Sequence, residues 1–478
     1  MKKSLKFLHV LLAFLIFSST SSALAQSQFQ TQSTVPGFPC YRDITAIYQS
    51  MQNLKSSYPN LVKLNQIGSS WDGMPIYALE ITNQSINESK PRLVLVSGLR
   101  ANAFAPLELS LRFAEELLAN YGESAEDSWI LDYLELDLIL LANPDGRLKA
   151  ELQAEQGLEI SWQNNVHNSC PENETGVRLN RNFPYQWRGS VTESCDAAYS
   201  GESPGSEAES QAIVNYLIAL KAEEERILLL HLDAIENEML SPFRYNPVAE
   251  NNYIDELYTL GKKITYNSLV KPYRQNESGY PATYGTLVDF AYGELDIPSL
   301  LFTMGSSMAG GHATECWYFD EYLLEANLAA LKQALKLSSE PFQRAYGPDL
   351  EIESLSYQQN SIIISGGADD YTKWFNGADQ YSSVKRIEYS IDLPPWHPQA
   401  ELYPVTKIEQ DSIYRFYARF ELEIPTEGLS EGKHRIYFQA WDEESDIAAS
   451  RPGIVSAIDF RVTAPENISK LYLPIIRK

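Results

Sequence analysis

Residues 91–122 read PRLVLVSGLRANAFAPLELSLRFAEELLANYG, and this stretch decides the fold class. Its first part, residues 91–98, is a short apolar run of the kind that forms a strand buried on both faces of a sheet. Its second part, residues 103–122, repeats apolar residues with helical spacing. A buried strand followed directly by a long helix is typical of an α/β protein.

The same alternation extends in both directions from this unit, over about residues 41–337. Helical spacing is present in residues 43–59, 206–225, 254–269 and 319–337. Asp43 is suited to cap the first of these helices. Strand-like apolar runs occupy residues 61–68, 74–81, 134–142, 225–232 and 297–304. We therefore expect a mixed sheet flanked by helices, with functional residues at the carboxyl ends of its strands.

Beyond Pro348 the pattern changes to short segments that alternate apolar and polar residues between turns, which is typical of a β-sandwich. We expect five consecutive parts. They are a signal peptide at residues 1–25, a linker at 26–40, the α/β domain at 41–345, a β-sandwich domain at 346–465 and a tail at 466–478.

The signal peptide is predicted from two early lysines, a following apolar run too short to span a bilayer, and the sequence Ser-Ser-Ala-Leu-Ala before a cleavage point. A retained membrane anchor is the alternative. No later apolar run is long enough to span a membrane. We therefore expect a protein that is secreted or associated with the cell surface.

The chain carries 63 acidic and 38 basic residues, and its formal net charge is −25. So acidic a chain is a poor partner for nucleic acid. Its four cysteines favour disulfides over metal sites in an exported protein. Cys170 and Cys195 bracket residues 176–189, so a bridge between them would hold that loop. Cys40 and Cys316 are candidates for a second pair, which the sequence leaves open.

Several blocks in order along the chain resemble the zinc carboxypeptidases of the carboxypeptidase A/B family. Residues 68–81 (GSSWDGMPIYALEI) are similar to an early hairpin of that family, and residues 143–146 (NPDG) to a turn after a strand. Residues 176–189 (GVRLNRNFPYQWRG) resemble the loop that grips the carboxylate of the substrate, and residues 199–213 and 280–304 also match. The resemblance covers about residues 41–337. It implies an exopeptidase fold in which a zinc-bound water attacks the last peptide bond of a chain.

That chemistry needs three protein ligands to zinc, and two of the matching positions are substituted. The first two ligands fall on Arg100 and Ala103, neither of which can bind zinc. The third falls on His231, which is the only ligand position that survives. A lone histidine at a strand end is more often a hydrogen-bonded remnant than a ligand.

The remaining chemical positions have changed as well. The carboxylate base of the family falls on Met304 or Gly305, and neither can accept a proton from water. The arginine that would polarise the scissile carbonyl falls on Gln163, whose neutral amide stabilises an oxyanion less well. No catalytic residue is therefore assigned, and no cofactor is expected.

The substrate-recognition positions are better preserved. Asn180 and Arg181 match the pair that holds the terminal carboxylate, and an arginine binds a carboxylate bidentately. Tyr280 matches a mobile tyrosine that closes over the last residue. Val288 falls at the floor of the side-chain pocket, where an apolar residue implies a preference for apolar or aromatic C-termini. In the alternative interpretation, Arg181 makes only a structural ion pair.

The residues allow two other arrangements of the site. A relocated metal site would use His231 and Asp233 with a third ligand such as His312 or Glu315. In the simpler arrangement, Arg100 takes the place of the metal and pairs with Asp233.

Three hypotheses for the function follow. The leading one is an inactive carboxypeptidase-like protein that binds the C-terminus of a peptide or protein through the retained arginine loop. The rival is an active zinc carboxypeptidase with a relocated metal site, which would require zinc. The third is an extracellular scaffold or binding protein that acts through the C-terminal β-sandwich.

Overall fold

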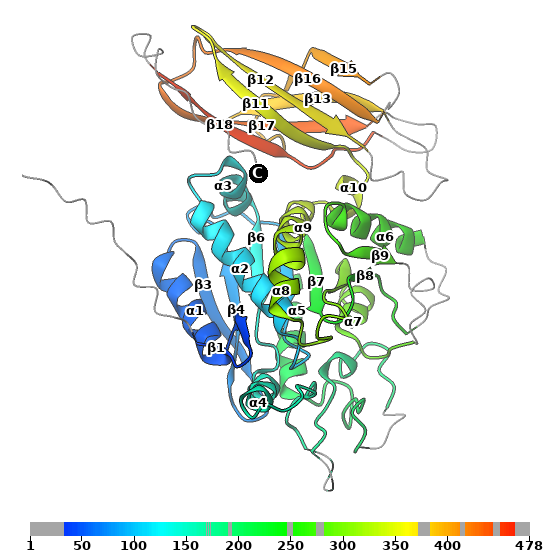
Figure 1. Cartoon of the computed structure of the whole chain (residues 1–478). Coiled ribbons are helices and arrows are strands. Elements are labelled where there is room, and N and C mark those ends of the chain that lie inside the picture. Colours follow the sequence, from blue (N-terminus) through cyan, green and yellow to red (C-terminus); the bar gives the residue numbers. More distant parts are fainter. Residues whose placement is uncertain are drawn as a thin grey trace, which may run out of the picture.

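The computed structural model describes residues 33–168, 170, 172, 174–189, 194–245, 252–273, 282–370, 383–411, 416–442 and 450–463, with the backbone alone for 252–254. The predicted signal peptide, most of the predicted linker and the predicted tail lie outside these residues. Figure 1 shows an α/β domain with a β-sandwich stacked on one end of it. Among the described residues, no helix combines the length and the apolar character needed to cross a membrane.

The α/β domain is built on an eight-stranded sheet in the order β3-β4-β6-β5-β7-β10-β8-β9. Its central strands β6, β5, β7 and β10 run parallel, and β3, β4 and the β10–β8 pair supply the antiparallel part. The mixed sheet predicted from the sequence is therefore correct. The strands are β3 (Val62–Ser69), β4 (Pro75–Ile81), β5 (Arg92–Val96), β6 (Glu135–Ile139), β7 (Ile227–Asp233), β8 (Glu238–Leu240), β9 (Lys271–Tyr273) and β10 (Ser299–Thr303). A separate hairpin joins β1 (Thr34–Val35) and β2 (Phe38–Arg42).

Helices cover both faces of this sheet. The larger core cluster packs beneath α1 (Ile44–Ser57), α2 (Phe104–Asn120), α3 (Ala125–Tyr133), α6 (Asn252–Thr265) and α9 (Leu324–Leu337). The opposite face packs against α5 (Ala208–Glu223) and α7 (Leu287–Gly293). The remaining helices are α4 (Pro144–Glu155), α8 (Cys316–Tyr318), α10 (Pro341–Arg344), the 3₁₀ turn η1 (Leu179–Arg181) and the π-turn η2 (Phe319–Leu323).

Strand β5 illustrates why these residues form a doubly covered sheet. Leu93 and Leu95 point into the larger core cluster, whereas Val94 and Val96 point into the smaller one on the opposite face. Successive side chains of a strand alternate between faces, so a continuous apolar run fits only a strand that is buried on both sides. This strand therefore lies at the centre of the domain.

The C-terminal region consists of two packed antiparallel sheets, as predicted. One sheet has the order β11-β12-β16-β15 and the other β14-β13-β17-β18. Between them lies a separate core cluster that includes Ile364, Phe420 and Phe438. The strands are β11 (Asp349–Tyr357), β12 (Ser361–Asp369), β13 (Val384–Ile391), β14 (Tyr403–Pro404), β15 (Lys407–Gln410), β16 (Tyr417–Pro425), β17 (Gly432–Asp442) and β18 (Ser456–Val462).

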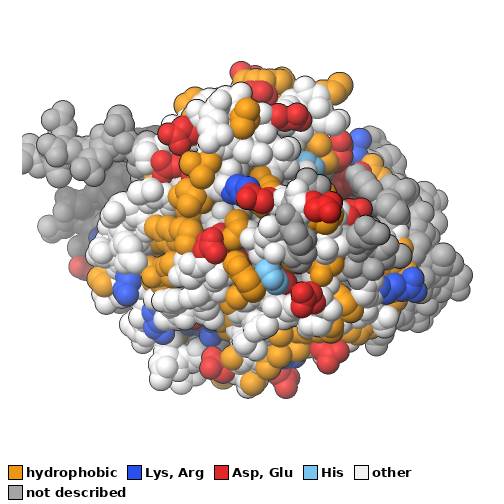
Figure 2. Space-filling model, turned by 90° about the horizontal axis from the view of Figure 1, so that it is seen from below, with side chains coloured by type: hydrophobic (Ala, Val, Ile, Leu, Met, Phe, Trp, Pro, Cys, Tyr) orange, Lys and Arg blue, Asp and Glu red, His pale blue; other side chains and the backbone are white. Residues whose placement is uncertain are grey.

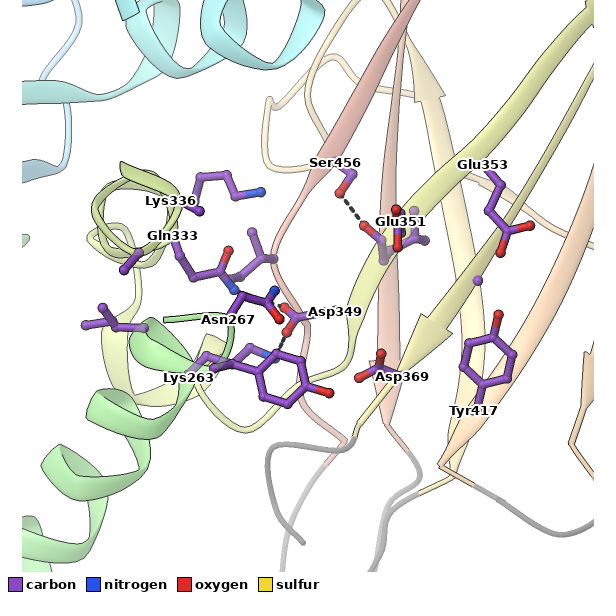
Figure 3. A pocket seen from close by; sticks show the side chains of 17 residues that line it. Lys263, Asn267, Gln333, Lys336, Asp349, Glu351, Glu353, Asp369, Tyr417 and Ser456 are labelled. Carbon is purple, nitrogen blue, oxygen red and sulfur yellow. Dashed lines mark hydrogen bonds and ion pairs between the residues drawn. The ribbon is translucent and has the colours of Figure 1, made fainter. Parts of the chain in front are cut away.

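The sandwich is joined to the α/β domain by a polar contact around Lys263 (Figure 3). This lysine lies on α6 and its side chain is fully buried. Its Nζ donates to the Gly347 carbonyl at 2.8 Å and lies 2.9 Å from Asp349 Oδ2 at the start of β11. A pocket of about 400 Å³ lies beside this contact, between α6, α9 and strands of the sandwich. The buried charge of Lys263 is thus satisfied by partners within the protein.

Aromatic side chains add to the same junction. The ring of Trp396 from the sandwich lies 5.8 Å from Trp129 and 5.9 Å from Tyr133, both on α3. In Figure 1, α3 and the start of β6 lie beside the sandwich, so the carboxyl ends of the parallel strands face away from it. The face at that far end, seen from below in Figure 2, shows acidic and apolar side chains with small, scattered groups of basic ones.

Candidate functional site

A small cavity of about 190 Å³ lies at the carboxyl ends of the central strands β5, β7 and β10. Of the described residues that line it, six have charged side chains, four of them arginines and two acidic, whereas the others are polar or apolar. The six are Arg100, Arg178, Arg181, Arg244, Asp233 and Glu238. A cavity with this excess of positive charge is unusual in a chain whose formal net charge is −25.

Arg100 enters the cavity from the turn that follows β5. The turn needs a glycine because Gly98 has φ +72° and a Cβ there would lie 2.6 Å from the Leu140 carbonyl. Arg100 binds Asp233 with two parallel contacts, Nε to Oδ1 at 2.8 Å and Nη2 to Oδ2 at 3.3 Å. Its Nη1 also donates to Gln163 Oε1 at 2.5 Å. The pairing of Arg100 with Asp233 suggested by the sequence is therefore present.

Asp233 is the last residue of β7 and is ionised in this arrangement. Burial alone would raise its pKa, but the charge of Arg100 and the hydrogen bonds from Arg100 and the Ala234 amide outweigh burial and hold the pKa below its ordinary value. The ion pair with Arg100 is partly buried, with side-chain exposures of 18% and 6%. A bidentate pair of this kind fixes both side chains at the cavity wall.

His231 lies two residues before Asp233 in the same strand and is fully buried. Neither ring nitrogen has a hydrogen-bond partner among the described residues. Burial, together with the neighbouring charge of Arg100, lowers the pKa of His231 to about 4, although Asp233 acts in the opposite direction. The imidazole is therefore neutral at physiological pH.

The side chains at this position do not fit zinc. An unpartnered imidazole such as His231 could serve as one ligand, but Arg100 brings a positive charge to its side, and the methyl group of Ala103 has no donor atom. Asp233 is already engaged by Arg100. Within the described ranges, no three His, Cys, Asp or Glu side chains are placed to hold a metal ion together. His312 and Glu315 therefore do not complete a metal site with His231 and Asp233. A zinc site needs at least three such ligands.

The arginine loop, residues 176–189, forms another wall of the cavity through Arg178, Asn180 and Arg181. A short 3₁₀ turn, η1, runs through it, and the Arg181 amide donates to the Arg178 carbonyl at 2.9 Å. Asn180 is fixed from outside, because its Oδ1 accepts from the Leu287 amide at 3.0 Å. The Cys170–Cys195 disulfide is present and closes a 25-residue separation around this loop. The second disulfide joins Cys40 to Cys316.

The two arginines of the loop differ in their partners. Arg178 donates from Nε to Asn164 Oδ1 at 2.8 Å and from Nη2 to the Ala197 carbonyl at 3.1 Å, and both acceptors are neutral. The Arg181 guanidinium has no hydrogen bond or ion pair with any described residue. Burial is the largest cause that lowers the pKa of both guanidinium groups, and the nearby charge of Arg100 is the second. The pKa of Arg178 falls to about 9. Like charges are therefore held close together here.

The other positions expected from the sequence are placed as follows. Val288 lies on α7, is 1% exposed and packs in the smaller core cluster, so it is not among the residues lining the cavity. Met304 is fully buried in the larger core cluster, and its amide donates to the Asp233 carbonyl at 3.0 Å. Gly305 follows it with φ +130°. Tyr280 lies outside the described residues.

Sequence reasoning missed part of the cavity wall. Arg178 lies within residues 176–189, three residues before Arg181. That spacing in a tight turn could have identified it as a neighbour of Arg181 in the cavity wall. Arg244, Thr283 and Thr286 also line the cavity. They come from segments without regular periodicity, so no pattern in the sequence indicated them.

His312 also lines the cavity, from the glycine-rich segment before α8. Burial lowers its pKa to about 4, and the charge of Arg100 adds to this effect. The positive charge of the cavity is therefore carried by the arginines alone.

Comparison with known proteins agrees with the fold. The yeast protein "Inactive metallocarboxypeptidase ECM14" of Saccharomyces cerevisiae is 27% identical over 234 residues, which are 48% of this chain and 53% of that protein. "Carboxypeptidase A1" of Sus scrofa is 25% identical over 309 residues, or 61% of this chain and 71% of the relative. This chain thus spans about half the length of the yeast relative.

A solved structure, the crystal structure of thrombin activatable fibrinolysis inhibitor, superposes with a TM-score of 0.56 at 20% identity, covering 63% of this chain and 75% of that one. This similarity concerns the fold alone. The family model described as "Zinc carboxypeptidase" matches residues 47–329. Since that match spans more than half of the chain, this protein belongs to the zinc carboxypeptidase family.

Proposed function

We propose that this protein is a member of the family without peptidase activity, and that it binds the free C-terminus of a peptide or protein in the arginine-lined cavity. The observation that carries the proposal is the state of Arg181. Its guanidinium lines the cavity, yet it has no ion pair among the described residues. A planar guanidinium matches a carboxylate with two parallel hydrogen bonds. Asn180 beside it contributes a neutral donor.

The proposed loss of activity rests on the residues at the family's chemical positions. Arg100 and Ala103 supply no zinc ligand, and the position of the carboxylate base falls on Met304, a buried thioether, or on Gly305, which has no side chain. Metal, base and electrophile supply most of the rate enhancement of such a hydrolase. The name of the yeast relative, an inactive metallocarboxypeptidase, supports the same interpretation.

The binding proposal is tested by calorimetric or NMR titration of two peptides that end in phenylalanine, one with a free carboxylate and one with a C-terminal amide. We expect the free acid to bind weakly, with a Kd on the order of 0.1–1 mM, because few groups anchor it. The amide should not bind, since a neutral amide cannot accept from both guanidinium donors.

Two variants sharpen this test. Arg181→Ala should abolish binding of the acid. Arg188→Ala removes the same charge from an exposed position of the same loop, outside the cavity lining, and should leave binding unchanged. Equal binding of the acid and the amide would mean that the arginine loop is only a structural remnant.

The rival function is an active zinc carboxypeptidase with a relocated metal site, and it is favoured only by the unpartnered imidazole of His231. We expect no release of C-terminal residues from blocked dipeptides or longer peptides. Turnover that a chelator abolishes would establish the rival in place of the present proposal.

We also propose that the protein works outside the cell. Two disulfides support this, because disulfides form and persist in oxidising compartments. The division into an α/β domain at 41–345 and a sandwich at 346–465 remains our proposal for the domain boundaries. The third candidate function is that of a scaffold or binding protein that acts through the sandwich. Binding of the acid peptide by Arg181→Ala would favour this candidate over binding in the cavity.

A further inference from the structure

The cavity carries more positive charge than one peptide carboxylate neutralises. Among the residues that the structure describes, its lining contains four arginines and two acidic residues, which gives a formal charge of +2. Asp233 is already engaged by Arg100. A ligand with a single carboxylate would therefore leave one positive charge uncompensated in a partly buried site, and burying an unpaired charge is costly.

Arg178 and Arg181 are placed to act together. They are the first and last residues of one tight turn, joined by the amide-to-carbonyl hydrogen bond of 2.9 Å. Residues three apart in a 3₁₀ turn lie on the same side of it, which explains why both arginines line the cavity. The like charges of Arg178 and Arg181 repel each other, and an anion bound between them would relieve the repulsion.

The size of the cavity limits where a second negative charge can lie. At about 190 Å³ it is smaller than the roughly 300–1,000 Å³ of typical small-molecule pockets. It therefore accommodates little more than the last residue of a peptide. A second anionic group that reaches Arg178 within this volume can be supplied by the side chain of the same residue whose α-carboxylate binds Arg181.

The rest of the lining combines hydroxyl groups with apolar side chains. Thr283, Thr286 and Thr303 all border the cavity. Val288, which the sequence places at an apolar floor, packs instead in the core and does not border it. Ile235, Leu240 and Leu301 also border the cavity, so its wall is mixed, and what distinguishes it is the pair of arginines rather than an apolar floor at Val288.

We infer that the cavity selects a peptide whose last residue is aspartate or glutamate, with the side-chain carboxylate held by Arg178 beside the α-carboxylate on Arg181. This inference rests on the proposed function, because it assumes that Arg181 binds the α-carboxylate. It replaces the expectation of an apolar or aromatic C-terminus.

The test is a calorimetric comparison of peptides that share one body and differ at the last residue. The probes end in glutamate, glutamine or phenylalanine as free acids, and a fourth ends in glutamine α-amide. We expect the glutamate peptide to bind at least about tenfold more tightly than the glutamine peptide, because charge-assisted hydrogen bonds are about twice as strong as neutral ones. N-acetylglutamate serves as a fifth probe and should bind more weakly than the glutamate peptide.

Variants locate the second carboxylate. Arg178→Gln should reduce the ratio of glutamate to glutamine affinity from about tenfold to near unity. Arg188→Gln, the same charge change on the same loop outside the cavity lining, should retain the full ratio. Should Arg178→Gln fail to fold because the bond to Asn164 is lost, the ratio measured on the unaltered protein still decides the question.

The outcomes separate this inference from the proposed function. Equal affinity for the glutamate and glutamine peptides, or tighter binding of the phenylalanine peptide, would overturn the inference. The proposed function would still stand if the glutamine acid binds and its amide does not. Equal affinity for the glutamine acid and its amide would overturn both. N-acetylglutamate that binds as tightly as the peptide would replace the peptide by a free dicarboxylate as the ligand.

Discussion

Buried basic residues are treated in opposite ways in two regions of this molecule. At the domain junction, Lys263 is fully buried and contacts Asp349 at 2.9 Å and the Gly347 carbonyl at 2.8 Å. In the cavity at the other end of the α/β domain, Arg178 and Arg181 have no ion pair among the described residues. The fold satisfies the charge at the junction and leaves the charge in the cavity unsatisfied.

This difference indicates what each region is for. A buried charge costs several kcal/mol unless it is paired, so a purely structural cation acquires a partner within the fold. Ionisable groups held in a cavity with depressed pKa and no partner of opposite charge are typical of functional sites. The comparison therefore supports a structural role for Lys263 and a ligand-binding role for the two arginines.

The largest effect is expected at the junction. Lys263→Met removes the ammonium group but keeps an unbranched stem, and it leaves the Gly347 carbonyl buried without its donor. We expect the free energy of unfolding to fall by about 3 kcal/mol, with the partial exposure of Asp349 limiting the loss. Urea denaturation measures this. Lys221→Met, at a half-buried lysine of α5 whose Nζ donates to the Glu225 carbonyl at the surface, is the control and should cause no measurable change.

A smaller, pH-dependent effect is expected from His231 in the cavity region. Its pKa is about 4 in the folded protein and 6.5 ordinarily, so between these values the unfolded chain binds a proton that the folded protein does not. Stability should therefore fall as the pH drops from about 6.5 to 4, by roughly 2–3 kcal/mol from this residue. Stability that shows the same pH slope in His231→Leu would contradict this account. The pKa of His312 is lowered in the same way, so part of the dependence of stability on pH should remain in His231→Leu.

The smallest stability change is expected at Arg181. Since its guanidinium has no ion pair among the described residues and lies near other arginines, Arg181→Gln should alter the free energy of unfolding by no more than about 0.5 kcal/mol. The same variant should lose binding of the C-terminal carboxylate. A loss of stability comparable to that of Lys263→Met would instead favour the structural ion pair considered as an alternative for Arg181.

Much of the fold could be predicted because the strong signals are local. Residues 91–98 form β5 as expected, and Asp43 caps α1 through its Oδ1 and the Ala46 amide at 2.8 Å. Helix α4 is not predicted from the sequence, because residues 143–146 resemble a turn after a strand. In the structure Asn143 caps this helix and Pro144 is its first residue, a position where proline lacks no needed donor.

The site was predictable only where it depended on strand ends. Arg100 follows β5 and Asp233 ends β7, and these strands are neighbours in the sheet, so their pairing could be anticipated. The position of Val288 in the core could not be anticipated, because it depends on how α7 is rotated about its axis. The Cys40–Cys316 pairing, across 276 residues, depends on the tertiary structure in the same way.

The central claim is that the zinc chemistry of the family has been replaced here by a cluster of arginines. Its most direct test is the zinc content of the purified protein after incubation with zinc and exhaustive dialysis, compared with that of His231→Ala. We predict far less than one zinc per chain, with no difference between the two proteins. One zinc per chain that survives dialysis and is lost in His231→Ala would contradict the claim.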